Sequence, residues 1–124
     1  MKNPVNWFEI ATTDLERAKD FYSKVFERNF QLIEMPESKM YMFEGVEGGG
    51  ALNASGALVL DKGNTPSADG TIVYFECEDA AVEEGRVEAA GGKVILPKMS
   101  IGQFGFISQI IDTEGNRIGL HSHK

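Results

Sequence analysis

Apolar and polar residues alternate along short segments of this chain, and these segments are interrupted by stretches with helical spacing. In residues 5–10, Phe8 and Ile10 lie on one face of an extended chain. Trp7 and Glu9 lie on the other face, which predicts a strand with one buried side. Residues 13–26 instead carry apolar side chains every three or four positions, which predicts an amphipathic helix with these buried positions: Leu15, Ala18, Tyr22, Val25 and Phe26.

The start of this helix has the pattern of a capping box. The Thr13 hydroxyl can accept a hydrogen bond from the backbone amide three residues further on, and the Glu16 side chain can accept one from the Thr13 amide. Three strands are predicted after the helix, at residues 30–35, 39–44 and 56–61, separated by a turn at 36–38 and a glycine-rich connection. The first half of the chain therefore has the order βαβββ.

The same order is predicted again after a polar linker at residues 62–70. An alternating strand at 71–78 precedes a helix that Asp79 can cap and that runs to about residue 90, where Gly91 and Gly92 favour a left-handed end. Gly85 lies inside this helix and lowers its stability by roughly 1 kcal/mol relative to alanine, so the helix can break near Gly85. Strands follow at 93–96, 104–111 and 117–121, the last two joined by a turn at 112–116.

The two halves are also alike in residues. Phe8-Glu9-Ile10 and Phe75-Glu76-Cys77 each end a first strand before a helix. A tandem duplication explains this with the fewest assumptions. We therefore expect one α+β domain over residues 1–124, with a first module at about 4–61 and a second at about 71–122.

Composition narrows the classes of function. The chain has 19 acidic and 12 basic residues and a net charge of −7, so it offers no basic surface to DNA or RNA. The single cysteine, Cys77, cannot form an internal disulfide, and the first residues lack the apolar run of a signal peptide. No stretch has the ~20 apolar residues of a membrane span. These features predict a cytoplasmic protein that binds neither nucleic acid nor membranes.

Two motifs resemble a known superfamily. They are Thr-Asp-Leu-Glu-Arg-Ala-Lys-Asp-Phe-Tyr at residues 13–22 and Asp-Thr-Glu-Gly-Asn-Arg-Ile at residues 112–118. In this order and separation, within two βαβββ units, they resemble the vicinal oxygen chelate superfamily of glyoxalases, bleomycin resistance proteins and dioxygenases. The resemblance implies a half-open barrel around a cleft, formed by the two modules, and a homodimer.

Metal enzymes of that superfamily carry one ligand on each of four strands facing the cleft. The resemblance assigns three of these positions to Trp7, Ile72 and Gly119, and the fourth falls near Leu58. None of these residues has an imidazole, carboxylate or thiolate donor. We therefore expect no metal cofactor in the usual position, while a divalent ion held by other residues stays an alternative.

The alternation of the strands predicts which side chains line the cleft, because the more apolar face of each strand should lie under a helix. The remaining face offers apolar and aromatic walls together with polar groups, as small-molecule pockets do. The predicted cleft residues are Trp7, Glu9, Ile72, Tyr74, Glu76, Arg117 and His121.

Glu9 and Glu76 are the candidate catalytic residues. Two carboxylates at matching positions of two modules can share a site and act as acid and base. The alternative is that both lie in solvent or pair with Arg117. His121 and His123 form a His-x-His pattern that can bind a metal together with one of these carboxylates, although residues at a chain end are usually solvated.

Two further features, the glycine-rich loop and Cys77, are not expected to take part in catalysis. The glycine-rich loop at residues 45–56 lacks the lysine and hydroxyl residue of a phosphate-binding loop, so it is expected to be either a flap over the cleft or a linker. Cys77 falls on the helix-covered face, which predicts an inert buried thiol.

Three functions are compatible with these residues. The first is a metal-free binding protein that holds a small apolar or aromatic molecule in its cleft. The second is a lyase or isomerase of the lactoylglutathione lyase type, working through unusual metal ligands or through Glu9 and Glu76. The third is a dimeric ferredoxin-like α+β barrel, whose βαβ-rich pattern overlaps this one.

Overall fold

The structure is a computed structural model that describes residues 4–44 and 54–124. Its first module contains β1 (Trp7–Ala11), α1 (Leu15–Phe26), β2 (Phe30–Glu34), β3 (Lys39–Phe43) and β4 (Ser55–Leu60). Its second module contains β5 (Val73–Glu76), α2 (Ala80–Val87), β6 (Lys93–Ser100), the 3-10 turn η1 (Gly102–Phe104), β7 (Phe106–Ile111) and β8 (Arg117–Ser122). The predicted order βαβββ, repeated once, is confirmed.

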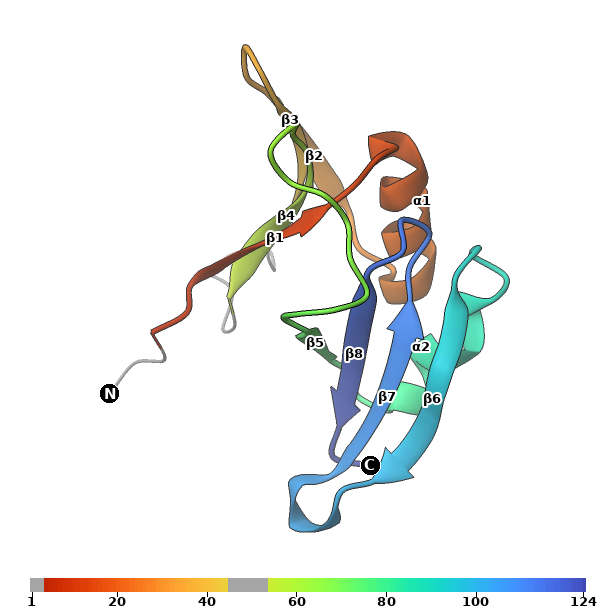
Figure 1. Ribbon diagram of the computed structural model, residues 1–124. Coiled ribbons are helices and arrows are strands. Elements are labelled where there is room, and N and C mark those ends of the chain that lie inside the picture. Colours follow the sequence, from red (N-terminus) through yellow and green to blue (C-terminus); the bar gives the residue numbers. More distant parts are fainter. Residues whose placement is uncertain (1–3, 45–53) are drawn as a thin grey trace.

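Each module forms one open, four-stranded sheet. The strand orders are β1-β4-β3-β2 and β5-β8-β7-β6, and in each sheet the first strand runs parallel to its neighbour while the other pairs are antiparallel. Between the described residues, no strand pairing joins the two sheets. Both helices lie on one side, so the opposite face of β6, β7 and β8 is turned to the viewer in Figure 1. The α+β class is confirmed.

Helix α1 begins differently from the prediction. Its N-cap is Asp14, whose side chain accepts from the Arg17 amide at 3.0 Å. The amide of Thr13 donates instead to Oε1 of Glu114, at 2.8 Å, and the Thr13 hydroxyl donates to the same oxygen. The predicted capping box between Thr13 and Glu16 is therefore wrong, because a carboxylate from the distant 112–116 turn satisfies the Thr13 amide.

Helix α2 confirms its predicted N-cap, but it ends at Val87 and not near residue 90. Asp79 is its N-cap and accepts from the Ala81 amide at 3.0 Å. The helix continues without a break through Gly85, because it packs on β6, β7 and β8 and these contacts outweigh the low propensity of one glycine. Gly91 follows the helix with a φ of 102°, the left-handed conformation that the sequence predicts at this end.

Several strand boundaries differ from the prediction. β5 starts at Val73, so Ile72 precedes the strand. β6 continues past residue 96 to Ser100 and includes Pro97, which is tolerated because β6 is an edge strand with register shifts. β7 starts at Phe106, because residues 102–104 form the 3-10 turn.

One hydrophobic core runs through both modules. Tyr22 of α1, Leu58 of β4 and Leu120 of β8 are fully buried members of the same cluster. Phe75 of β5 stacks on Phe26 of α1, with ring centroids 4.4 Å apart. α1 also packs against α2. The two modules are therefore joined by apolar packing between helices and aromatic rings.

The turn at residues 112–116 adds a polar joint between the modules. The Glu114 carboxylate accepts from Arg17 Nε at 2.7 Å and from the amides of Thr13 and Asp14, and its side chain is fully shielded from solvent. Burial alone would raise the pKa of Glu114, but these hydrogen bonds outweigh burial and lower its pKa to about 2. The carboxylate thus stays charged at neutral pH.

Two further side chains of this turn reach the first module. Tyr22 donates its hydroxyl to Asp112 Oδ2 at 2.6 Å, and burial together with the Asp112 charge raises the pKa of Tyr22 well above its usual value. Asn116 donates to the carbonyl of Ala11 at 2.8 Å. The two motifs that carry the family resemblance therefore contact each other and hold the modules together.

Among the described residues, no helix has the length and apolar character needed to cross a membrane.

Candidate functional site

A cleft of about 1250 Å³ lies between the first strands of the two modules. Residues of both modules line it, and its walls are largely aromatic and aliphatic. Six of the seven residues predicted from strand alternation lie in this cleft: Trp7, Glu9, Ile72, Tyr74, Glu76 and His121.

Strand register explains why these side chains converge. β5 runs parallel to β8, so that Glu76 lies opposite His121 and Tyr74 lies opposite Gly119. Side chains at opposed positions project from the same face of a sheet, and here that face is not covered by a helix. On β1, Trp7 and Glu9 share a face, and the Trp7 indole donates to Glu9 Oε2 at 3.3 Å.

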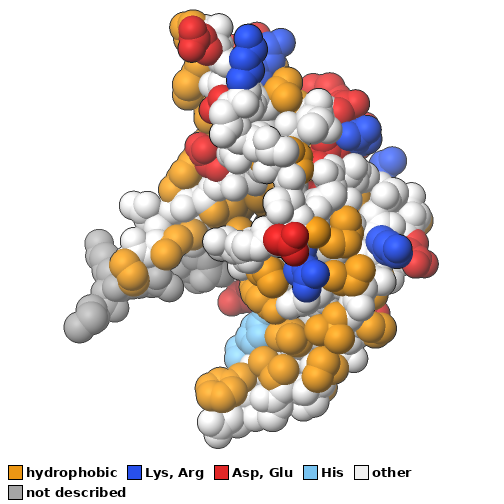
Figure 2. Space-filling view, in the orientation of Figure 1, with side chains coloured by type: hydrophobic (Ala, Val, Ile, Leu, Met, Phe, Trp, Pro, Cys, Tyr) orange, Lys and Arg blue, Asp and Glu red, His pale blue; other side chains and the backbone are white. Residues whose placement is uncertain are grey.

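The helix-free face of the second sheet is rich in apolar side chains. Figure 2 shows hydrophobic groups gathered over β6, β7 and β8, with the histidines at the edge of this area. Tyr74, Ile95, Met99 and Phe104 are among the large apolar side chains with substantial exposure. Exposed apolar surface of this kind is typical of a ligand or protein contact.

Tyr74 lies across β8 toward β7. A Cβ atom at Gly119 would overlap the Tyr74 ring, so the ring occupies the space that a side chain on β8 would take. The Tyr74 hydroxyl accepts a hydrogen bond from Gln109 Nε2 at 2.7 Å. Gln109 was missed by the sequence prediction, because the contact depends on the register of β5, β8 and β7.

One of the positions assigned to metal ligands needs a correction. Leu58 is fully buried in the core cluster together with residues of α1, so its side chain does not face the cleft. Trp7 and Ile72 line the cleft, and Gly119 lies opposite Tyr74. None of the four assigned residues offers an imidazole, carboxylate or thiolate, so their side chains do not fit a metal ion.

No group of three or more His, Cys, Asp or Glu side chains suited to a metal ion is present within residues 4–44 and 54–124.

The two histidines differ in position. His121 lines the cleft, and its Nε2 donates to the carbonyl of Phe104 at 2.7 Å, so Nε2 carries a proton. His123 lies beyond the end of β8, is exposed, and contacts the His121 ring edge to face at 4.9 Å between centroids. The structure therefore brings one histidine of the His-x-His pattern into the cleft.

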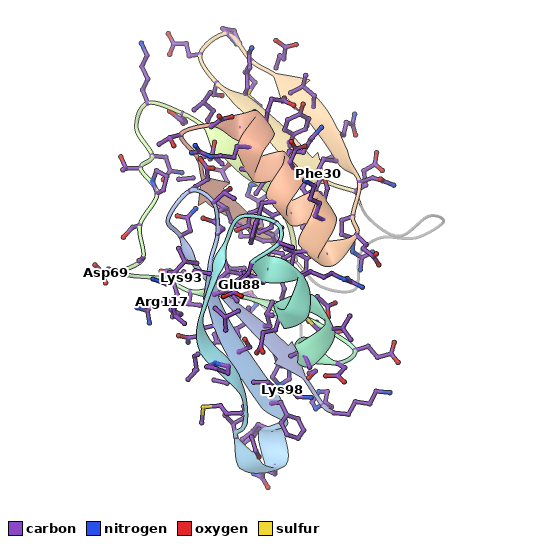
Figure 3. All side chains as sticks on the ribbon, turned by 90° about the vertical axis from the view of Figure 1, so that its right-hand side faces the viewer. Phe30, Asp69, Glu88, Lys93, Lys98 and Arg117 are labelled. Atoms are coloured by element: carbon purple, nitrogen blue, oxygen red, sulfur yellow. The ribbon has the colours of Figure 1, made fainter. Side chains whose placement is uncertain are left out.

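Arg117 is the predicted residue that lies outside the cleft. It borders a smaller hollow of about 140 Å³ below the 62–70 linker, where its Nε donates to the Ala68 carbonyl at 3.1 Å. Figure 3 shows Arg117 near Asp69 on this side of the molecule. Glu9 borders the same hollow, yet no carboxylate forms an ion pair with Arg117 within the described part of the chain.

The inner part of the cleft contains residues that strand alternation did not predict. Phe26, Phe43 and Phe75 line it from the helix side, and Glu83 of α2 adds a third carboxylate. Phe26 and Phe75 belong to faces that the pattern assigns to the core. They reach the cleft because the gap between the two sheets opens onto the joint between the modules, which no local pattern encodes.

Two other predictions have different outcomes. Cys77 is buried, and burial raises the pKa of its thiol to about 12, so it stays protonated at neutral pH. The predicted flap or linker at residues 45–56 lies largely outside the described residues, which resume at residue 54.

Comparison with protein sequences gives a partial and a nearly full-length match. The family model "Bleomycin resistance protein-like N-terminal" matches residues 5–46. "Putative glyoxylase CFP32" of Mycobacterium bovis is 28% identical over 121 residues, or 93% of this chain and 44% of that protein. The chain thus spans less than half the length of this curated relative.

Solved structures match the whole architecture. A glyoxylase/bleomycin resistance protein/dioxygenase domain from Frankia sp. has a TM-score of 0.76 at 19% identity, with full coverage of both chains. A mutant of glyoxalase I from Zea mays has a TM-score of 0.74 at 18% identity and covers 97% of this chain and 46% of that chain. At these identities, the likeness shows the fold.

Two open four-stranded sheets, each with one helix and with a cleft between their first strands, define an α+β protein of the glyoxalase fold. In sequence, the chain is similar to a bleomycin resistance protein-like family over residues 5–46 and to a glyoxylase over most of its length, and in fold it is similar to glyoxalase/bleomycin resistance protein/dioxygenase domains.

Proposed function

We propose that this protein binds a small molecule with an aromatic or apolar body in the cleft between its modules, without a metal ion. The observation that carries the proposal is the convergence of Trp7 and Tyr74, one from each module, on the same cleft of about 1250 Å³. A cleft of this kind, with a few polar groups among apolar walls, suits a small organic ligand. The absence of donor side chains at the four usual ligand positions supports binding without metal.

The single tryptophan makes this proposal directly testable. Trp7 lines the cleft and its indole N–H gives one signal in a ¹⁵N correlation spectrum. Titration with the uncharged dye N-phenyl-1-naphthylamine should shift this signal and raise the emission of the dye. A Trp7→Ala variant, followed by dye emission, should bind at least about 5-fold more weakly, since a large aromatic contact is lost.

The matched control is Leu32→Ala, because Leu32 is 45% exposed and Trp7 is 40% exposed, but Leu32 lies on β2 outside the cleft. Dye affinity of Leu32→Ala should equal that of the wild type. Equal losses in both variants, or no shift of the indole signal, would contradict a cleft site. A thermal-shift series with Mg²⁺, Zn²⁺ and Ni²⁺ tests the metal-free part, for which we expect no large stabilisation by any ion.

A second candidate function is a lyase or isomerase of the lactoylglutathione lyase type. One observation favours it. Glu9, Glu76 and His121 line the same cleft, and their side chains are of the kinds that transfer protons in enzymes. The Mycobacterium bovis relative is also named as a glyoxylase. Turnover of the methylglyoxal–glutathione hemithioacetal, lost in Glu9→Gln and kept in the exposed control Glu37→Gln, would support this function over simple binding.

We further propose that the chain pairs into a homodimer through its helix-free surfaces. The support is the exposed apolar area around Ile95, Met99 and Phe104, which a monomer would leave in contact with water. Sedimentation velocity measures this directly. A single monomeric species at micromolar concentration would contradict it.

A further inference from the structure

A directed chain of hydrogen bonds crosses the helix-free face of the second sheet. Arg117 of β8 donates from an Nη atom to Gln109 Oε1 at 3.4 Å. Gln109 of β7 then donates from Nε2 to the Tyr74 hydroxyl at 2.7 Å. The chain thus runs from the hollow below the 62–70 linker toward β5, whose side chains line the cleft.

The direction of this chain follows from the chemistry of its first member. A guanidinium has only donors, so the Gln109 atom next to Arg117 is its carbonyl oxygen. The other end of the same amide is then an NH₂ group, which has only donors, and the Tyr74 oxygen must accept from it. Arg117 itself is held by its second bond, from Nε to the Ala68 carbonyl.

The accepted bond determines what the Tyr74 hydroxyl can do. Because its oxygen accepts from Gln109, its hydrogen is free to donate to another group. The ring cannot easily turn away, since it lies against the backbone at Gly119. Tyr74 is 43% exposed, so this hydrogen is available to a ligand on the helix-free face.

We propose that the Tyr74 hydroxyl donates a hydrogen bond to a carbonyl oxygen of the cleft ligand, and that Gln109 is the residue that orients this hydroxyl as a donor. The inference rests on the proposed binding function and names the ligand class as uncharged aromatic carbonyl compounds. An uncharged acceptor is favoured over a carboxylate because three carboxylates line the cleft, those of Glu9, Glu76 and Glu83, against one guanidinium, that of Arg28.

Two simple ligands of similar shape test the proposal. Acetophenone carries the carbonyl and ethylbenzene lacks it. Their dissociation constants are measured by ¹⁵N titration of the full chain, with the Trp7 indole signal as the reporter. A change that affects both ligands alike cancels in the ratio of their dissociation constants. The two ligands also differ in hydrophobicity, and this difference cancels when the ratio is compared between variants.

The variants separate donation by Tyr74 from its other roles. In Tyr74→Phe, the preference for acetophenone should fall about 5- to 10-fold, which is the effect of one lost hydrogen bond. In Gln109→Glu the preference should fall by a similar factor, because a carboxylate only accepts and the Tyr74 hydrogen turns toward it. In Gln109→Met the preference should stay within about 3-fold of the wild type, because the Tyr74 hydroxyl then has no competing acceptor.

The outcomes distinguish the roles of Tyr74 and Gln109 from the binding function itself. If both ligands bind and their ratio is unchanged in Tyr74→Phe, the donor role of Tyr74 is wrong while the binding function stands. If Gln109→Glu and Gln109→Met have the same effect, the orienting role of Gln109 is wrong. If neither ligand nor N-phenyl-1-naphthylamine shifts the Trp7 signal, the binding function itself is overturned. Circular dichroism of each variant establishes that it is folded.

Discussion

At the scale of single residues, one shielded carboxylate, that of Glu114, joins the two modules. Glu114 accepts hydrogen bonds from Arg17, Thr13 and Asp14, all of which belong to the other module. Its negative charge is thereby held at a point where the backbone at the start of α1 offers unpaired amides. The acidic residue that follows Asp112 and Thr113 in the family motif is thus part of a structural joint.

A Glu114→Gln substitution should lower the free energy of unfolding by about 2 kcal/mol at pH 7. The lowered pKa, about 2, implies a larger value, but Arg17 is half exposed and solvent screens part of the interaction. Urea denaturation measures the difference. The control is Glu37→Gln in the exposed 36–38 turn, for which we expect a change within about 0.5 kcal/mol.

The ionisation of Glu114 also predicts how the stability difference between the wild type and Glu114→Gln depends on pH. The folded-state pKa of Glu114 is depressed from 4.5, so its stabilisation is complete above pH 4.5 and is lost as the pH falls toward 2. The gap in stability between wild type and Glu114→Gln should therefore be constant from pH 7 to pH 5 and should narrow by pH 3. A gap that is equally wide at pH 3 and pH 7 would mean that the charge of Glu114 is not its cause.

At the scale of elements, most helices and strands could be predicted because each has one buried face. α1 follows from its apolar spacing, and β1, β7 and β8 follow from their alternation. One error lies at a place where a distant segment supplies a missing partner, since Thr13 finds Glu114 in place of Glu16. Gly85 stays helical because α2 rests on the second sheet.

A Gly85→Ala substitution should stabilise the protein by about 0.5–1 kcal/mol. The added Cβ would meet no atom within 4 Å, and alanine loses less conformational entropy in a helix. The matched control is Gly115→Ala, because its Cβ also points into open space but its φ is 93°. Thermal unfolding should show a higher Tm for the first variant and a lower Tm for the second.

At the scale of the whole molecule, the joint between the modules determines both stability and the shape of the cleft. Tyr22 and Asp112, together with the stacked rings of Phe26 and Phe75, connect the first module to the second. The same joint forms the inner wall of the cleft, where Phe26 and Phe75 are exposed to a ligand. Binding and cooperativity therefore depend on the same contacts.

The two modules should consequently unfold as one unit. Trp7 fluorescence reports on the first module, and amide hydrogen exchange of β7 and β8 reports on the second. Both should give the same free energy of unfolding, and Glu114→Gln should lower both by the same amount. Separate transitions in urea would show that the aromatic and polar joint is too weak to couple the modules.

The candidate site was only partly predictable. Trp7, Glu9, Tyr74, Glu76 and His121 were found because alternation alone decides which face of a strand a side chain occupies. Gln109 was not found, since its role depends on lying two strands away from Tyr74. Arg117 was assigned to the correct face but borders a different hollow, because the 62–70 linker covers the end of β8 from which it projects.

The amino-acid sequence by itself determined the two βαβββ modules, the buried face of each element and the pair of motifs typical of the superfamily. These properties arise from local periodicity and local backbone chemistry, which act over a few residues. Only the tertiary structure decided that Glu114 accepts from the Thr13 and Asp14 amides, that Tyr74 covers Gly119, and that Phe26 and Phe75 line the cleft. Those contacts join residues far apart in the chain, and their geometry is determined by strand register and by the packing of one module on the other.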